Sequence, residues 1–104
     1  MIVVSITYPN AAGARFDWNY YQGTHLPMVG RKLGGFGLAS ASVLKGEQSA
    51  DGGAPAYTAI AFLSFSSLEN ANLALASGEA RELMADIPNF TDVTPVIQLS
   101  SAVP

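Results

Sequence analysis

A chain of 104 residues is long enough for a single domain, expected to span residues 1–104, with a modest core. Five Lys and Arg residues against eight Asp and Glu residues give a net charge of −3, without the basic surface that nucleic acids require. The absence of Cys and the single His exclude disulfides and multi-histidine metal sites within one chain. No apolar run approaches the roughly 20 residues of a membrane span and no targeting segment is recognisable, so we expect a cytoplasmic protein.

Charged residues make up 12% of the chain, whereas an average soluble domain has roughly 25%. The mean hydropathy is positive, at +0.26. So few charges cannot cover the surface of a monomer, and we expect one apolar face to be buried in a homodimer.

The first half of the chain predicts a strand and a helix. Residues Ile2–Tyr8 are mostly β-branched, and Pro9 ends the run. Asp17 is a favoured helix N-cap, and Gly34 and Gly35 supply the end of the helix that follows. Within this helix the apolar and aromatic residues recur at helical spacing and share one inward face, made of Trp18, Tyr21, His25, Met28 and Val29.

Pro27 interrupts this helical pattern. It has no N–H to donate to the carbonyl of Gly23, and its ring crowds the preceding turn. We therefore expect a kink or a local irregularity near His25, with the small Gly23 leaving room for it.

The second half predicts two strands and a second helix. The strands are Phe36–Lys45 and Tyr57–Phe65, and the latter is mostly apolar at both its odd and its even positions. A strand of this kind is covered on both faces. Ser66 and a glutamate three residues later form a capping box for the second helix, which Gly78 interrupts.

Val93–Leu99 predicts the last strand, and Pro95 within it favours an edge position or a strand start. The resulting order is βαββαβ, the ferredoxin-like α+β arrangement, with both helices on one face of an antiparallel sheet. Because Tyr57–Phe65 is apolar on both sides, we expect two such sheets to pack face to face in a dimeric α+β barrel.

The segment Phe16–Pro27 holds the only Trp, the only His and two of the four Tyr of the chain. Histidine is the side chain that most readily exchanges protons near neutral pH, so His25 is the natural proton shuttle. Tyr21, four residues earlier, is its expected stacking or hydrogen-bond partner, while Tyr20 faces the sheet or the second copy. The alternative is a core histidine whose ring nitrogens are satisfied by the protein.

This segment resembles the F-D-x-x-Y-Y-x-x-x-H-x-P signature of the EthD family. A second stretch, Asp86–Asp92, is similar to the acidic and aromatic segment that these proteins carry before their last strand. The residues that match the signature are Phe16, Asp17, Tyr20, Tyr21, His25 and Pro27.

The resemblance implies a dimeric α+β barrel with a ligand pocket between helices and sheet. Relatives in that superfamily include cofactor-free monooxygenases, lactone isomerases and polyketide cyclases, and EthD-like proteins are associated with ether and aromatic degradation. We therefore expect an oxidoreductase or isomerase that uses no cofactor and acts on a small apolar or aromatic metabolite. Its catalytic residues would be His25 and Tyr21, and its substrate contacts Trp18, Tyr20, Met28, Val29, Asp86 and Phe90.

Two other functions stay open. A non-catalytic dimer would use the same pocket without proton transfer. A haem-binding protein would use His25 as an axial ligand, although no basic cluster lies nearby in the sequence to pair with the propionates. A serine hydrolase and a dinucleotide site are disfavoured, because neither G-x-S-x-G nor G-x-G-x-x-G occurs.

Overall fold

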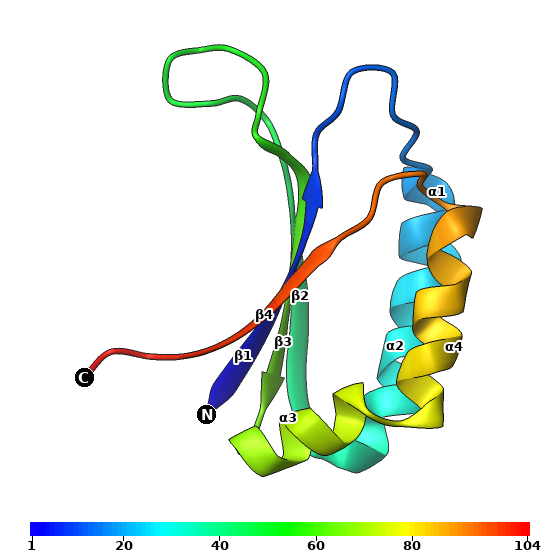
Figure 1. Cartoon of the computed structure of the whole chain (residues 1–104), viewed down its shortest axis with the longest axis vertical. Coiled ribbons are helices and arrows are strands. Elements are labelled where there is room, and N and C mark those ends of the chain that lie inside the picture. The colour runs from blue at the N-terminus through cyan, green and yellow to red at the C-terminus, as the bar shows by residue number, and fades with distance from the viewer.

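The computed structural model describes residues 1–104 and has one antiparallel sheet with all its helices on one side (Figure 1). The strands are β1 (Ile2–Pro9), β2 (Leu38–Lys45), β3 (Tyr57–Phe65) and β4 (Val96–Ser101). The helical segments are α1 (Trp18–Tyr20), the π-helix η1 (Tyr21–His25), α2 (Leu26–Leu33), the 3₁₀ turn η2 (Gly34–Phe36), α3 (Leu68–Leu75), α4 (Gly78–Asp86) and the 3₁₀ turn η3 (Ile87–Asn89).

The sheet order is β2-β3-β1-β4, with β1 and β3 in the centre. In its register Val4 of β1 lies opposite Leu63 of β3 on one side and Leu99 of β4 on the other. This topology confirms the predicted βαββαβ ferredoxin-like α+β fold.

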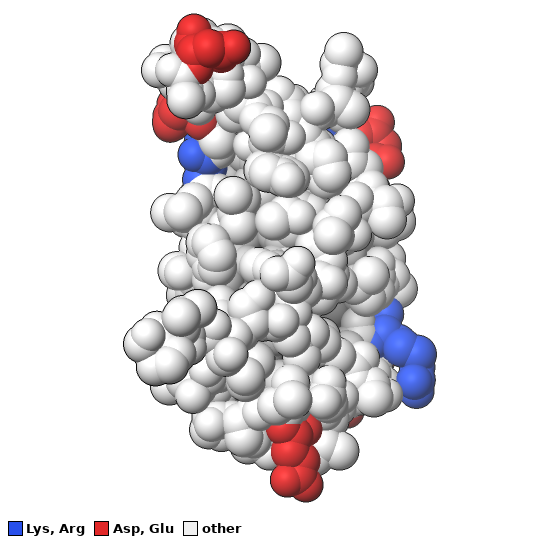
Figure 2. Space-filling view, turned by 60° about the vertical axis from the view of Figure 1, so that its left-hand side comes forward, with Lys and Arg blue, Asp and Glu red and all other residues white.

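The two faces of the sheet have different surroundings. Val4, Ala61, Leu63 and Phe65 are buried beneath the helices and form much of the core. The strand β3 is apolar on the side of the helices, and its other face carries Ile60 and Phe62 together with the polar Thr58 and Ser64. That open face carries no charged residue; it consists of Val3, Ser5, Thr7, Ser40, Ser42, Leu44, Thr58, Ile60, Phe62, Ser64, Val96, Gln98 and Ser100. Figure 2 brings this side forward and shows the charged side chains at the ends and margins, with uncharged atoms between them.

The predicted irregularity near His25 is confirmed as the π-helical turn η1. The N–H of Leu26 donates to the carbonyl of Tyr21, five residues earlier. The following Pro27 has no N–H, so it cannot supply the bond that would continue an α-helical ladder here. The interpretation of Gly23 was wrong, because a Cβ at that position would have no atom within 4 Å.

The helix starts are set by side-chain caps. Asp17 accepts a hydrogen bond from the Tyr20 N–H, as predicted. The predicted capping box was wrong by one residue: Ser67, not Ser66, caps α3 by accepting from the Asn70 N–H at 3.1 Å. The predicted break at Gly78 is confirmed, because Ser77 caps a new helix, α4, at this point.

The last strand begins at Val96 rather than Val93. Pro95 immediately precedes it and cannot donate to a ladder, so pairing with β1 starts one residue later. The strand β4 lies at the sheet edge, as its proline favoured. No helix of the chain is long and apolar enough to span a bilayer.

Candidate active site

His25 ends the π-turn η1 and is paired with an aspartate from a second helix. Its Nδ1 lies 2.9 Å from Oδ2 of Asp86, the last residue of α4, and both side chains are buried. The segment that contains His25 and the helix α4 run side by side on the same face of the sheet (Figure 1). Asp86, which we expected to contact a substrate, is hydrogen-bonded to the histidine ring and is not among the residues that line the pocket beside it.

The second oxygen of Asp86 is also occupied. Its Oδ1 accepts hydrogen bonds from the Tyr20 hydroxyl at 2.6 Å and from Asn89 Nδ2 at 2.9 Å. Burial opposes ionisation of Asp86, but the hydrogen bonds from Tyr20, His25 and Asn89 outweigh it and hold the pKa of this carboxyl below its ordinary value. The hydrogen bond to Asp86 raises the pKa of the Tyr20 phenol in turn. Asp86 is therefore a carboxylate, and Tyr20 a neutral donor, at neutral pH.

This network fixes the tautomer of the neutral imidazole. A carboxylate only accepts hydrogen bonds, so Nδ1 of His25 carries the proton and Nε2 carries the lone pair. No protein group bonds to Nε2. Every fully buried side-chain nitrogen and oxygen of the chain has a hydrogen-bond partner, so Nε2 is not fully buried. The Nε2 atom is therefore available to a ligand or water, and His25 is one of the residues that line a cavity.

The cavity lies between the sheet and the helices and has a volume of about 260 Å³. A cavity of roughly 150 Å³ accepts a benzene molecule, so this one has room for a single ring with substituents. Its wall combines the helix-facing side of β1, β3 and β4 with η1, α2, α3, α4 and η3. The lining residues are Ile6, Tyr8, His25, Val29, Leu33, Leu63, Leu75, Ala80, Leu83, Met84, Ile87 and Ile97.

Two buried aromatic rings hold the imidazole in place. The ring of Tyr21 stacks on that of His25 with centroids 5.6 Å apart and an angle of 17°, and the Phe90 centroid lies 4.6 Å away. Stacking by Tyr21 is as predicted, but no hydrogen bond joins Tyr21 to His25. Burial raises the pKa of Tyr21 to about 12, so its phenol stays protonated. Tyr21 and Phe90 pack against His25 and are not among the residues that line the cavity.

The other predicted site residues are distributed around this centre. Val29 lines the cavity as expected, whereas Met28 packs against the neighbouring core. Tyr20 points to Asp86 and not to the sheet. Trp18 lines a separate hollow on the other side of η1.

Sequence reasoning missed two kinds of contributor. Asn89 lies within the second stretch that resembled the family, yet it was not singled out as a partner of Asp86. The cavity residues Ile6, Ile97 and Met84 belong to strands and a helix whose apolar pattern is the same as that of ordinary core. The chain holds no cluster of three or more His, Cys, Asp or Glu side chains that could bind a metal ion.

Fold and site together define a ferredoxin-like α+β protein with a histidine in the wall of an apolar cavity. The profile of the EthD domain matches residues 12–94, and the chain belongs to the EthD family. Among solved structures, it is 40% identical to an EthD-like protein of Ralstonia eutropha JMP134, with a TM-score of 0.88 over 99% of this chain and 92% of that one.

More distant structures share the fold. An ethyl tert-butyl ether D (EthD) family protein of Bacillus halodurans C-125 is 18% identical, with a TM-score of 0.71 over 99% of this chain and all of that one. SnoaB, a cofactor-independent oxygenase of Streptomyces nogalater, is 14% identical, with a TM-score of 0.52 over 97% of this chain and 89% of that one. A comparison with curated proteins gives no match.

Proposed function

We propose that this EthD-family protein is an enzyme in which His25 removes a proton from a small apolar or aromatic metabolite. The observation that carries the proposal is the orientation of the imidazole. Its Nδ1–H is held by the Asp86 carboxylate, which leaves Nε2 without a protein partner, and the other residues that line the cavity of His25 are hydrophobic. This is the arrangement of a general base with an orienting acid behind it.

The proton transfer follows from the charges at the site. When Nε2 accepts a proton from a C–H or O–H of the substrate, the ring becomes an imidazolium, and the Asp86 carboxylate stabilises that positive charge. The hydrophobic lining lowers the polarity around the pair, which strengthens the attraction between the imidazolium and the Asp86 carboxylate.

Two outcomes are open to the substrate anion. Return of the proton to a different carbon makes the enzyme an isomerase. Reaction with O₂ makes it a monooxygenase, in which a CH₂ group becomes a carbonyl, one oxygen atom enters the product and the other leaves as water. The second outcome is supported by the fold that the chain shares with the Streptomyces cofactor-independent oxygenase. Membership of the EthD family agrees with the place in ether or aromatic degradation that the sequence resemblance implies, and we include that role and a cytoplasmic location in the proposal.

The competing function is ligand binding without chemistry. Eleven of the twelve cavity residues are hydrophobic, which is sufficient to bind an apolar molecule with no proton transfer at all. Haem binding fits less well, because no Lys or Arg lines the cavity to pair with propionates.

The open sheet face supports a homodimer. It carries no charged residue, and Ile60 and Phe62 lie near its centre. An uncharged face of this extent on a small domain is stabilised by packing against an equivalent face. We therefore include a face-to-face dimer in the proposal.

Hydrogen–deuterium exchange tests the proton transfer before the complete reaction is known. Cyclic ketones, lactones and dihydroxylated single-ring aromatics are incubated with the protein in D₂O, and the loss of each C–H signal is followed by NMR. We expect the wild type to accelerate exchange for at least one compound that it binds, and His25→Gln to bind that compound without exchange. Binding with no acceleration by either protein would favour the non-catalytic function.

A further inference from the structure

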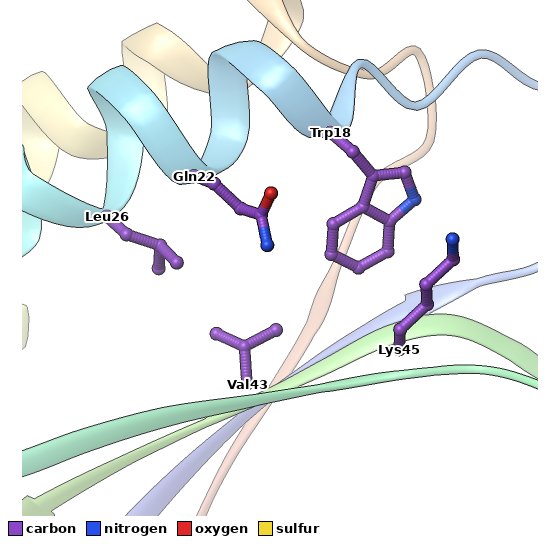
Figure 3. A pocket seen from close by; sticks show the side chains of 5 residues that line it. All are labelled: Trp18, Gln22, Leu26, Val43 and Lys45. Atoms are coloured by element: carbon purple, nitrogen blue, oxygen red, sulfur yellow. The ribbon is translucent and has the colours of Figure 1, made fainter.

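A second hollow lies on the opposite side of η1, against the edge strand β2 (Figure 3). Its volume is about 160 Å³. The indole of Trp18 and the amide of Gln22 point from the helical segment toward the strand, and Val43 and Lys45 point up from β2 (Figure 3). Leu26, four residues after Gln22, completes the lining.

This hollow is distinct from the cavity of His25. The two share no lining residue. The buried ring of Tyr21 separates them, with its centroid 5.7 Å from that of Trp18 and 5.6 Å from that of His25. A molecule in the second hollow would therefore not touch the imidazole.

The lining of the hollow combines three kinds of contact. The ammonium group of Lys45 lies 5.5 Å from the centre of the Trp18 ring and has no carboxylate within ion-pair distance, whereas Lys32 is paired with Glu82. The side-chain amide of Gln22 makes no hydrogen bond within the protein and can donate two. Val43 and Leu26 supply an apolar floor. A cation and an amide donor beside an aromatic wall are suited to an anion that carries a flat ring.

We propose that this hollow binds a small aromatic carboxylate. The ring would pack between the Trp18 indole and Val43, and the carboxylate oxygens would accept hydrogen bonds from Lys45 Nζ and the Gln22 amide. A volume of roughly 150 Å³ is enough for one benzene ring, so the hollow selects single-ring acids over larger ones. A neutral ring of the same shape would leave the charge of Lys45 without a partner.

The single tryptophan of the chain is the reporter for the test. Sodium benzoate is titrated into the protein while the fluorescence of Trp18 is followed, with benzamide as the uncharged ring of matched size and N-acetyltryptophanamide as the control for collisional quenching. We expect a saturable change with benzoate and about tenfold weaker binding of benzamide, since hydrogen bonds to charged groups contribute more than neutral ones. A change that is only linear, as for the free indole, would overturn the proposal.

Three variants locate the binding. Lys45→Met keeps the length of the side chain and should weaken benzoate binding about tenfold or more. Lys32→Met, the matched lysine on α2, should leave it unchanged, and so should His25→Gln. Unchanged binding to Lys45→Met would contradict the proposal, and loss of binding in His25→Gln would assign benzoate to the other cavity. These outcomes do not depend on whether the protein is an enzyme.

Discussion

His25 Nδ1 and Asp86 Oδ2 lie 2.9 Å apart although 61 residues separate them in the chain. The first belongs to the π-turn that leads into α2, and the second ends α4. The contact therefore exists only when the two helices are packed side by side. Because Asp86 is ionised and points its Oδ2 at Nδ1, the pair both connects the helices and orients the imidazole.

His25 itself can be tested with two substitutions that separate chemistry from structure. If His25 is the general base, His25→Gln should lower turnover by about 10²–10⁴-fold while ligand binding survives, because glutamine cannot exchange protons near neutral pH. His25→Ala should lower turnover equally and leave one Asp86 oxygen unpaired, at a cost of about 1–3 kcal/mol in the free energy of unfolding. Steady-state kinetics and thermal melts measure the two effects. A lower melting temperature with nearly intact turnover would indicate a structural histidine.

The lowered pKa of Asp86 makes a pH-dependent contribution to stability. A carboxyl whose pKa is lower in the folded state stabilises the protein above its unfolded-state pKa, near 4, and loses that contribution as the pH falls through the folded value. Asp86→Asn should therefore reduce the free energy of unfolding most at neutral pH, by about 1–3 kcal/mol, and progressively less below about pH 4. Urea unfolding over a pH series measures this. Glu47→Gln, in the exposed loop, is the control, and an equal difference for Asp86→Asn at all pH values would contradict the prediction.

The cavity can be filled from α4 without touching the His25–Asp86 pair. Ala80 lies in its wall, and Ala80→Leu adds three carbon atoms to the free space. Ligand affinity should fall about tenfold or more, while the melting temperature stays the same or rises, as is usual when an existing cavity is filled. Ala85→Leu, at an exposed position of the same helix, should change neither quantity. Unaltered ligand affinity in Ala80→Leu would show that ligands bind elsewhere.

Pro27→Ala tests the role of the π-turn. Alanine restores an N–H that can donate to an earlier carbonyl, so the turn should relax toward an α-helix and raise the melting temperature. The same change should displace the His25 ring and weaken ligand binding. Backbone and imidazole NMR shifts, with ligand titrations, follow both effects. An unchanged helix path together with unchanged binding would refute the prediction.

Phe62→Asp tests the proposed dimer. A carboxylate in the middle of the open face would be buried without a partner in a face-to-face dimer, which is strongly unfavourable. Light scattering should give twice the chain mass of 10.8 kDa for the wild type and the chain mass for the variant. Leu73→Asp, at an exposed leucine on the helical side, should remain dimeric. A wild-type mass near 10.8 kDa would rule the dimer out.

The element order was predictable because its signals are local. The Asp17 cap, the Pro27 interruption and the apolar pattern of Tyr57–Phe65 each act within a few residues of where they stand. Errors arose where neighbouring residues offered equivalent chemistry. Ser66 and Ser67 both have the hydroxyl group that a helix N-cap needs. The structure places Ser67, with its extended backbone conformation, immediately before the first turn of α3, so that Ser67 is the cap.

The partner of His25 was not predictable from the same signals. Tyr21 has the correct spacing to reach it along one helix, and it does stack on the ring. The hydrogen bond goes instead to Asp86, because the relative position of two helices decides it and no local pattern encodes that position. The different roles of Tyr20 and Tyr21 also depend on how the two helices pack. The hydroxyl of Tyr20 points at Asp86, whereas the ring of Tyr21 is buried against the imidazole of His25.

The π-turn also says where the chain can lose a residue. It holds one residue more than the α-helical turn it replaces, and its closing bond joins Leu26 to Tyr21. Loss of one residue between them would let the same span close as an ordinary α-helical turn, because four α-helical residues complete about the same rotation as these five. Trp18 and Tyr20 would then keep their places, and the change would be confined to the residues of the turn itself. Among related sequences, a one-residue alignment gap here would therefore mark a protein with the same helix direction but without the bulge that precedes His25.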